Sequence, residues 1–135
     1  MEVFFPDVAL VWSLMRLVGD GLTYHLYTND HSPTLLDTLD DFTEAFYSGY
    51  APIQVLPDDW ASSGVANHLG GLHAPNIVYH NISPSPVDIF GYFVTDLAGT
   101  QLVCAARLDI APEHVVPGAN IVISPILGSY SGLEP

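Results

Sequence analysis

Six histidines are the first residues in this chain that could do chemistry, since imidazole binds metals and transfers protons. His68 and His73 stand five residues apart beside a pair of glycines. That spacing places them together on neither a helix face nor a strand face, and it is not the ligand spacing of a zinc site. We therefore predict no metal site and no bound cofactor, and expect the histidines to lie in solvent or in an interface.

Four carboxylates close together could instead supply oxygen ligands to Ca²⁺; they are Asp37, Asp40, Asp41 and Glu44. The segment lacks the alternating acidic spacing and the central glycine of a calcium-binding loop. Thr38 or Asp40 followed by Glu44 is also typical of the capped start of a short helical turn. The helical turn is the simpler interpretation, and calcium stays open.

Catalytic motifs are missing from the sequence. No serine stands in a strand-turn-helix setting, no Gly-rich phosphate loop is present, and the only cysteine, Cys104, lies in an apolar run where a small buried side chain is expected. Enzymes of anionic substrates also use Arg or Lys, and this chain has two such residues in total. We predict no catalytic residues and no enzyme, although a site built on paired carboxylates would leave no motif.

Most of the elements that would position these residues are strands. Residues 7–18 have helical periodicity, with Asp7 as N-cap and Gly19 as the stop, and are apolar on nearly all sides. After Gly19 the apolar residues alternate instead, and residues 96–100 form a hairpin signal around Gly99. The expected strands are 22–27, 51–56, 60–66, 76–82, 89–95, 102–108 and 115–124.

This pattern predicts a mainly β chain: an antiparallel β-sandwich, jelly-roll-like, of about six to eight strands with one N-terminal helix. Residues 1–19 would form an arm and helix, and residues 20–135 the sandwich, as parts of one structural domain. The N-terminus carries acidic residues where a secretion signal carries basic ones, and its apolar run is too short to cross a membrane. We expect a protein made in a cytoplasm.

Charge and hydrophobicity narrow the function further. Two Arg and no Lys stand against 15 acidic residues, so the net charge of −13 repels nucleic acid and anionic lipid. Hydrophobic residues make up 49% of the chain, more than one small domain hides easily, which favours a homo-oligomer, most simply a trimer. Each Arg is expected to have a carboxylate partner. The interface candidates are Phe4, Phe5, Val8, Trp12, Met15, Arg16 and Arg107.

Several short motifs resemble those of small tailed-phage virion proteins, over about residues 22–126. They are residues 26–30 (LYTND) with Pro33, residues 41–45 (DFTEA), residues 49–51 (GYA), Trp60, residues 91–94 (GYFV), and Ala106 with Arg107. The resemblance implies a capsid cement, or decoration, protein: a β-rich trimer on the outside of a phage head that clamps the major capsid protein and has no reactive residues. A tail or fibre module, or a small β-sandwich enzyme or binding domain, are the alternatives.

Overall fold

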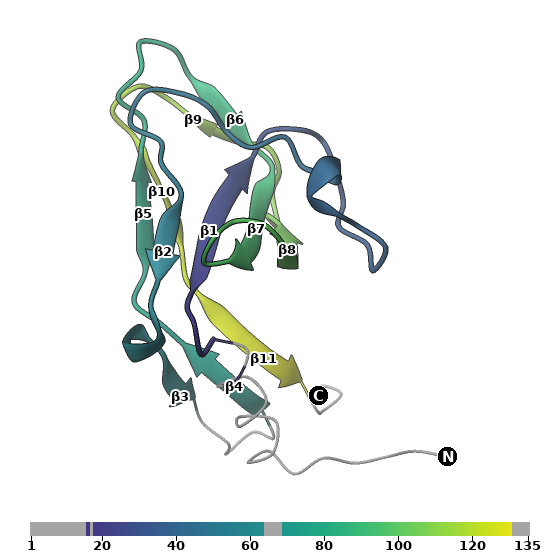
Figure 1. Cartoon of the computed structure of the whole chain (residues 1–135). Coiled ribbons are helices and arrows are strands. Elements are labelled where there is room, and N and C mark those ends of the chain that lie inside the picture. The colour runs from purple at the N-terminus through teal and green to yellow at the C-terminus, as the bar shows by residue number, and fades with distance from the viewer. Residues whose placement is uncertain (1–15, 17, 64–68, 131–135) are drawn as a thin grey trace. The chain divides into compact units, whose positions relative to one another are not determined.

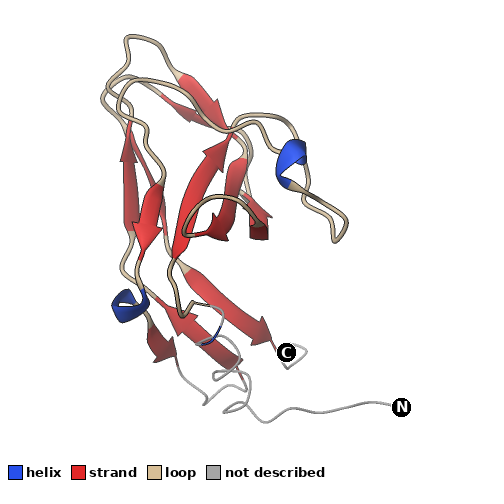
Figure 2. Cartoon of the chain, in the orientation of Figure 1, coloured by secondary structure: helices blue, strands red, loops and turns tan. Residues whose placement is uncertain are grey.

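The computed structural model describes residues 16, 18–63 and 69–130. Within these residues the chain forms eleven strands and two single-turn 3₁₀ helices, and no α-helix (Figures 1 and 2). The elements are β1 (Leu22–Tyr27), η1 (Leu39–Asp41), β2 (Ile53–Val55), η2 (Pro57–Asp59), β3 (Ala61–Ser63), β4 (Leu69–His73), β5 (Ile77–His80), β6 (Val87–Ile89), β7 (Gly91–Asp96), β8 (Leu102–Arg107), β9 (Glu113–Val115), β10 (Asn120–Ile123) and β11 (Ile126–Tyr130). The prediction of a mainly β chain with antiparallel sheets is confirmed.

The chain divides into two compact units. Unit 2 comprises Leu22–Gln54 and Ile77–Ile123, and it contains the sheet β2-β1-β7-β8 and the strand pairs β5–β10 and β6–β9. The described residues of unit 1 lie within Met1–Gly21, Val55–Asn76 and Ser124–Pro135, and they contain the three-stranded sheet β11-β4-β3. The helix expected over residues 7–18 falls almost wholly outside the described residues, so it stays a prediction, as does the division at residue 19.

The strand expected over residues 22–27 is confirmed as β1, which lies inside the main sheet of unit 2, between β2 and β7. It pairs antiparallel with β7 from Leu22 opposite Asp96 to Tyr27 opposite Gly91. All six of its residues are buried, the polar Thr23 and His25 among them. Both faces of this strand are therefore covered by other residues of the chain.

One face of the sheet packs against a cluster of aromatic rings. Phe42 lies 5.0 Å from Tyr27 and 5.0 Å from Phe93, measured between ring centroids. Phe42 follows η1, so the segment between β1 and β2 is anchored on the sheet at this point (Figure 1). A second contact joins β5 to β1, because the Tyr79 hydroxyl donates a hydrogen bond of 2.8 Å to the Tyr24 carbonyl.

The predicted hairpin at residues 96–100 connects β7 to β8. Gly99 has φ 78°, the left-handed conformation that glycine adopts without steric cost. The Asp96 carboxylate accepts hydrogen bonds of 2.7 Å from both the Thr100 amide and the Thr100 hydroxyl, and these contacts hold the pKa of Asp96 below its ordinary value. The register shifts between Val94 and Thr95, opposite an extra residue, Val103, in β8.

The structure corrects the expected number of strands. The described residues contain eleven strands where about six to eight were expected, because β4 and β11 contain glycines that hide the alternation and β6 and β9 have only three residues each. The expected strand 89–95 is divided at Phe90, and the expected strand 115–124 is divided by a turn at Pro117 and Gly118. The strands expected at 51–56 and 76–82 are shorter than predicted. Of the strand expected at 60–66, the structure shows β3 over Ala61–Ser63, and residues 64–66 lie outside the described residues.

Candidate functional site

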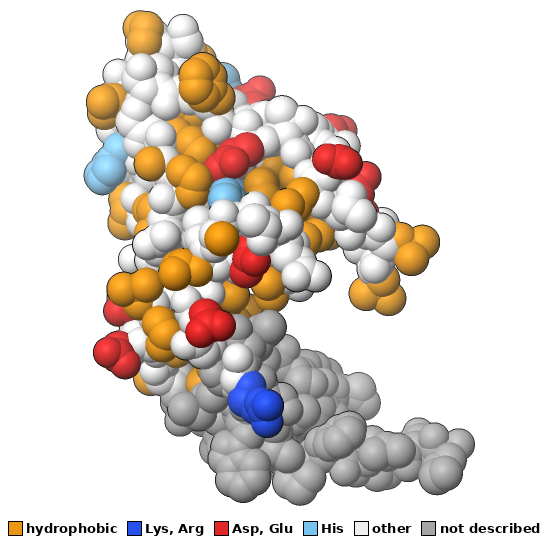
Figure 3. Space-filling view, in the orientation of Figure 1, with side chains coloured by type: hydrophobic (Ala, Val, Ile, Leu, Met, Phe, Trp, Pro, Cys, Tyr) orange, Lys and Arg blue, Asp and Glu red, His pale blue; other side chains and the backbone are white. Residues whose placement is uncertain are grey.

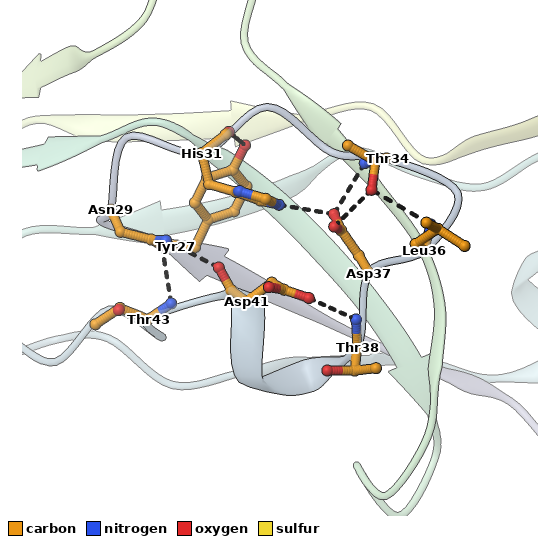
Figure 4. A network of polar contacts seen from close by, with 9 residues as sticks. All are labelled: Tyr27, Asn29, His31, Thr34, Leu36, Asp37, Thr38, Asp41 and Thr43. Carbon is orange, nitrogen blue, oxygen red and sulfur yellow. Dashed lines mark hydrogen bonds and ion pairs between the residues drawn. The ribbon is translucent and has the colours of Figure 1, made fainter.

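A polar network fixes the segment between β1 and η1 in unit 2 (Figure 4). Asp37 is its centre: its carboxylate accepts hydrogen bonds of 2.7 Å from His31 Nε2, and of 2.9 Å each from the Thr34 amide and the Thr34 hydroxyl. The side chain of Asp37 is 7% exposed. The hydrogen bond from His31 is the largest of the effects that hold the pKa of Asp37 below its ordinary value. An ionised Asp37 therefore braces the loop that carries it.

The helical turn predicted near Thr38 is confirmed as η1, but its cap differs from the prediction. The Asp41 carboxylate, not that of Glu44, accepts a hydrogen bond of 2.8 Å from the Thr38 amide. Asn29 joins this turn to the end of β1, because its side chain donates to the Asp41 carbonyl at 2.9 Å and accepts from the Thr43 amide at 2.8 Å. Asp37, Asp41 and Glu44 thus face protein donors, which gives these three carboxylates structural roles.

Two leucines at the tip of this braced loop are exposed to solvent. Leu35 is 103% exposed and Leu36 is 91% exposed. The segment that carries them extends away from the four-stranded sheet of unit 2 (Figure 1), and hydrophobic side chains are visible at its end in the space-filling view (Figure 3). Burying a leucine side chain stabilises by about 1.5–3 kcal/mol, so two adjacent leucines held in water mark a surface that gains energy by contacting another molecule. We name Leu35 and Leu36 the leucine tip.

A groove separates the leucine tip from the edge strand β8. It has a volume of about 490 Å³, with Pro33, Thr34, Leu35 and Asp37 on one wall and the residues of β8 from Leu102 to Ala105 on the other. A second hollow of about 360 Å³ continues it toward the β7–β8 hairpin, between Asp37, Asp40 and the residues from Thr100 to Leu102. The two hollows share Asp37 and Leu102 in their walls, and we refer to them together as the groove. Its walls combine apolar side chains with two acidic residues, Asp37 and Asp40.

Cys104 was expected to be a small buried side chain, and the structure places it half-buried in the wall of this groove. Burial raises the pKa of its thiol to about 11. At neutral pH the side chain is therefore a neutral thiol, which is the weakly nucleophilic form of cysteine. It acts here as a small apolar wall of the groove.

A buried histidine forms the strongest network that the sequence did not indicate. His25 stacks on Phe93 with ring centroids 4.6 Å apart, and its Nδ1 and Nε2 lie 2.8 Å from a Glu44 carboxylate oxygen and 2.9 Å from the Thr95 hydroxyl. Glu44 also accepts a hydrogen bond of 2.6 Å from the Tyr50 hydroxyl. The order Thr, His, Glu is that of a hydrolase triad, but Thr95 is 0% exposed and its hydroxyl donates to the Asp96 carbonyl. Buried in this way, Thr95 cannot reach a substrate, so the network joins strands.

Of the interface candidates that the sequence suggested, only Arg16 and Arg107 lie among the described residues. Arg107 has the expected carboxylate partner: its Nη1 lies 2.7 Å from Asp30, and its guanidinium lies 5.4 Å from the centre of the Phe90 ring. Arg16 is exposed, and no ion pair to it is found among the described residues. The other interface candidates, Phe4, Phe5, Val8, Trp12 and Met15, lie outside the described residues, as does His68.

Two of the other histidines pair with a residue on the neighbouring strand. His80 Nδ1 lies 2.6 Å from the Asn120 side-chain oxygen, and His114 Nδ1 lies 2.7 Å from an Asp88 carboxylate oxygen. His73 is exposed at the end of β4. Among the residues that the structure describes, no three His, Cys, Asp or Glu side chains come together in a way that could hold a metal ion.

Comparison of this chain with known protein families, with curated proteins and with solved structures finds no match. In the described part of the chain, no helix has the length and the apolar character that a membrane span requires.

Proposed function

We propose that this protein is a non-enzymatic structural protein of a phage virion, a cement protein that binds the major capsid protein on the outside of the head. The observation that carries the proposal is the leucine tip: two fully exposed leucines on a loop that His31, Thr34 and Asp37 brace. A braced loop loses little conformational freedom when its tip is buried, so more of the burial energy is available for binding. We take the major capsid protein as the partner because short motifs of the sequence resemble those of small phage virion proteins.

The same proposal includes a homotrimer and an acidic exterior. A net charge of −13 disfavours nucleic acid and anionic membranes as partners, and an acidic coat limits contact between particles. The trimer contacts would come from the N-terminal arm, with Phe4, Phe5 and Trp12 as anchors, because large aromatic residues contribute most at interface centres. The chain would be made in the host cytoplasm and remain on the virion.

For the fold we propose a β-sandwich of the jelly-roll type. Two contacts within unit 2 support it. The Tyr79 hydroxyl bonds the Tyr24 carbonyl at 2.8 Å, and the Tyr50 and Tyr79 rings stack 5.7 Å apart, which brings β5 over the sheet that contains β1. Sandwiches bury their cores between two such sheets.

The test is attachment to particles. Virions that lack the protein are incubated with it, and bound protein is measured by sedimentation and located by cryo-electron microscopy. We expect density on the head, and a loss of binding of at least tenfold for the double variant Leu35→Ser/Leu36→Ser, since two buried leucines contribute several kcal/mol. Ile110→Ser is the matched control, because Ile110 is 84% exposed but lies away from this loop in the sequence. Density on the tail, or equal binding by both variants, would contradict the proposal.

Light scattering tests the trimer separately. We expect a mass of about three times 14.6 kDa, falling toward the monomer for Trp12→Ala. If the wild-type protein is monomeric at micromolar concentration, the trimer is removed from the proposal. Binding to particles is then decided by the attachment experiment alone.

A further inference from the structure

Strand β8 is the outer strand of the sheet β2-β1-β7-β8, with no further strand paired to it among the described residues. It has six residues, Leu102–Arg107, of which five are apolar, and all are half-buried. Edge strands are commonly protected by Lys, Pro or short length. This edge strand has neither Lys nor Pro and is as long as β1, so its protection within the strand is limited to the charged Arg107 at its end and the extra residue at Val103.

The hydrogen-bond pattern shows which backbone groups of β8 are available. Asp96 donates its amide to the Gln101 carbonyl at 3.1 Å at one end of the ladder, and Leu108 donates to the Phe90 carbonyl at 3.0 Å at the other. Bonded and non-bonded pairs alternate in an antiparallel ladder, so Ala105 and Arg107 are non-bonded toward β7. Their N–H and C=O groups therefore point outward, and none of them has a hydrogen-bond partner among the described residues.

The groove lies along this open edge. Its two hollows together line the turn residues Thr100 and Gln101 and β8 from Leu102 to Ala105, a length of roughly 17 Å at the rise of a strand. Ala105, with its outward N–H and C=O, lies at one end of this groove, and Arg107 lies beyond it. Apolar residues on both walls suit the side chains of an extended segment. Strand addition of this kind obtains affinity from main-chain hydrogen bonds and specificity from the side-chain pockets.

The charge of the groove indicates which kind of segment would bind along β8. Asp37 and Asp40 line the groove, and Arg107, the only basic residue of β8, is already paired with Asp30 at 2.7 Å. A second copy of the chain would bring another charge of −13 and a second pair of groove carboxylates to the same place. A segment with Lys or Arg beside its apolar residues would be attracted instead.

We propose that the β8 edge binds an extended segment of a different protein, which adds as an antiparallel strand beside β8 and places a basic side chain against the exposed carboxylate of Asp40. The site shares Leu35 with the leucine tip, because this residue also lines the groove, but the proposal is independent of whether the partner belongs to a capsid.

The test uses full-length protein and synthetic peptides of alternating Val and Thr. One peptide has Lys at both ends, a second has Glu at both ends, and a third is the Lys peptide with alternate backbone amides methylated. Hydrogen exchange is followed at the amides of Ala105 and Arg107, and labelling of Cys104 by a neutral thiol reagent gives a second measurement. We expect the Lys peptide to slow both amides and Cys104 labelling at least tenfold, the Glu peptide to bind at least tenfold more weakly, and the methylated peptide to give no amide protection.

Two variants extend the test from the protein side. Ala105→Pro removes an outward N–H without removing a bond to β7, and should abolish protection of Arg107 by the Lys peptide. Should this variant unfold, Asp40→Lys supplies the second measurement, since it should reverse the preference between the Lys and Glu peptides. No protection by the Lys peptide at millimolar concentration, or equal protection by the methylated one, would overturn strand addition. In the absence of peptide, amide protection that increases with protein concentration would show that a second copy of the chain occupies the edge. That result would also overturn the proposal.

Discussion

At the scale of single residues, Gly91 shows how closely the chain is packed around the main sheet. A Cβ atom at this position would lie 2.6 Å from the Tyr27 ring and hydroxyl and would also overlap the Ala106 carbonyl. Tyr27 cannot move aside freely, because it is 0% exposed and its hydroxyl donates to the His31 carbonyl at 2.8 Å. The absence of a side chain at Gly91 therefore leaves the space that the Tyr27 ring occupies.

We predict that Gly91→Ala lowers the free energy of unfolding by about 2–4 kcal/mol, since one methyl group must displace a buried ring or the backbone of β8. Urea denaturation measures the change. Gly118→Ala is the control: Gly118 has φ 85° and open space around its Cβ position, so only backbone strain of about 1 kcal/mol is expected. Equal losses of unfolding free energy in the two variants would show that the Tyr27 ring moves aside without an energetic penalty.

Asp37 predicts an effect of acid on stability. Its pKa is held below the ordinary value of 3.8, chiefly by the hydrogen bond from His31. A carboxylate with a lowered pKa in the folded state stabilises fully above its unfolded pKa, and that contribution is lost as the pH falls through the folded value. We therefore expect Asp37→Asn to be less stable than wild type near pH 6, and the two proteins to converge as the pH falls below the ordinary value of 3.8. Urea titrations at a series of pH values measure this, and parallel curves would contradict it.

At the scale of elements, Asn81 joins the end of β5 to the end of β9. Its side chain is 0% exposed, and its Nδ2 donates to the carbonyls of Val115 at 2.8 Å and Ser85 at 3.1 Å, while its Oδ1 accepts from the Ser83 amide at 3.0 Å. Every polar atom of this buried amide is satisfied, so it fixes the connection between the two strands.

We predict that Asn81→Asp lowers the free energy of unfolding by about 3 kcal/mol, because a buried carboxylate oxygen would face two carbonyls that it cannot bond. Asn29→Asp is a matched control, since Asn29 bonds backbone groups in the same manner at an exposed position, and about 0.5–1 kcal/mol is expected there. Similar losses at the two positions would show that burial of Asn81 does not decide its contribution.

The elements that the sequence predicted well are those with long, regular alternation. Strands 22–27 and 102–108 and the hairpin between β7 and β8 are found almost as expected, since period-2 patterns and Gly99 identify them locally. Strands β4 and β11 were not predicted, because glycines remove the side chains that carry the pattern. Their pairing depends on residues far apart in the chain, which no local pattern encodes.

The candidate site was harder to predict than the strands. The sequence located the acidic segment and the helical turn, but not which donors each carboxylate would face. Glu44 was read as part of the cap, whereas it bonds His25, which lies 19 positions earlier. The leucine tip could have been found from one signal: two adjacent leucines inside a Pro, Thr and Asp loop fit neither strand nor helix periodicity.

At the scale of the whole molecule, electrostatics is dominated by repulsion. Only two residues are permanently cationic against 15 carboxylates, and one of the two, Arg107, is paired with Asp30. Folding brings like charges closer than they are in the unfolded chain, so net charge destabilises the compact state. Salt should weaken this repulsion, since its screening length falls from about 30 Å at 0.01 M to about 8 Å at 0.15 M.

We therefore predict that raising NaCl from about 0.01 to 0.3 M at pH 7.5 increases the free energy of unfolding by on the order of 1 kcal/mol, the opposite of what loss of attractive ion pairs would give. Urea is the suitable denaturant, because it is uncharged. The same titration at pH 4.2, the isoelectric point, should show little change, since the net charge vanishes there. Sucrose at matched osmolarity controls for effects of the solute other than screening. Stability that fell with salt at pH 7.5 would mean that local pairs such as Arg107 with Asp30 outweigh the repulsion of the chain as a whole.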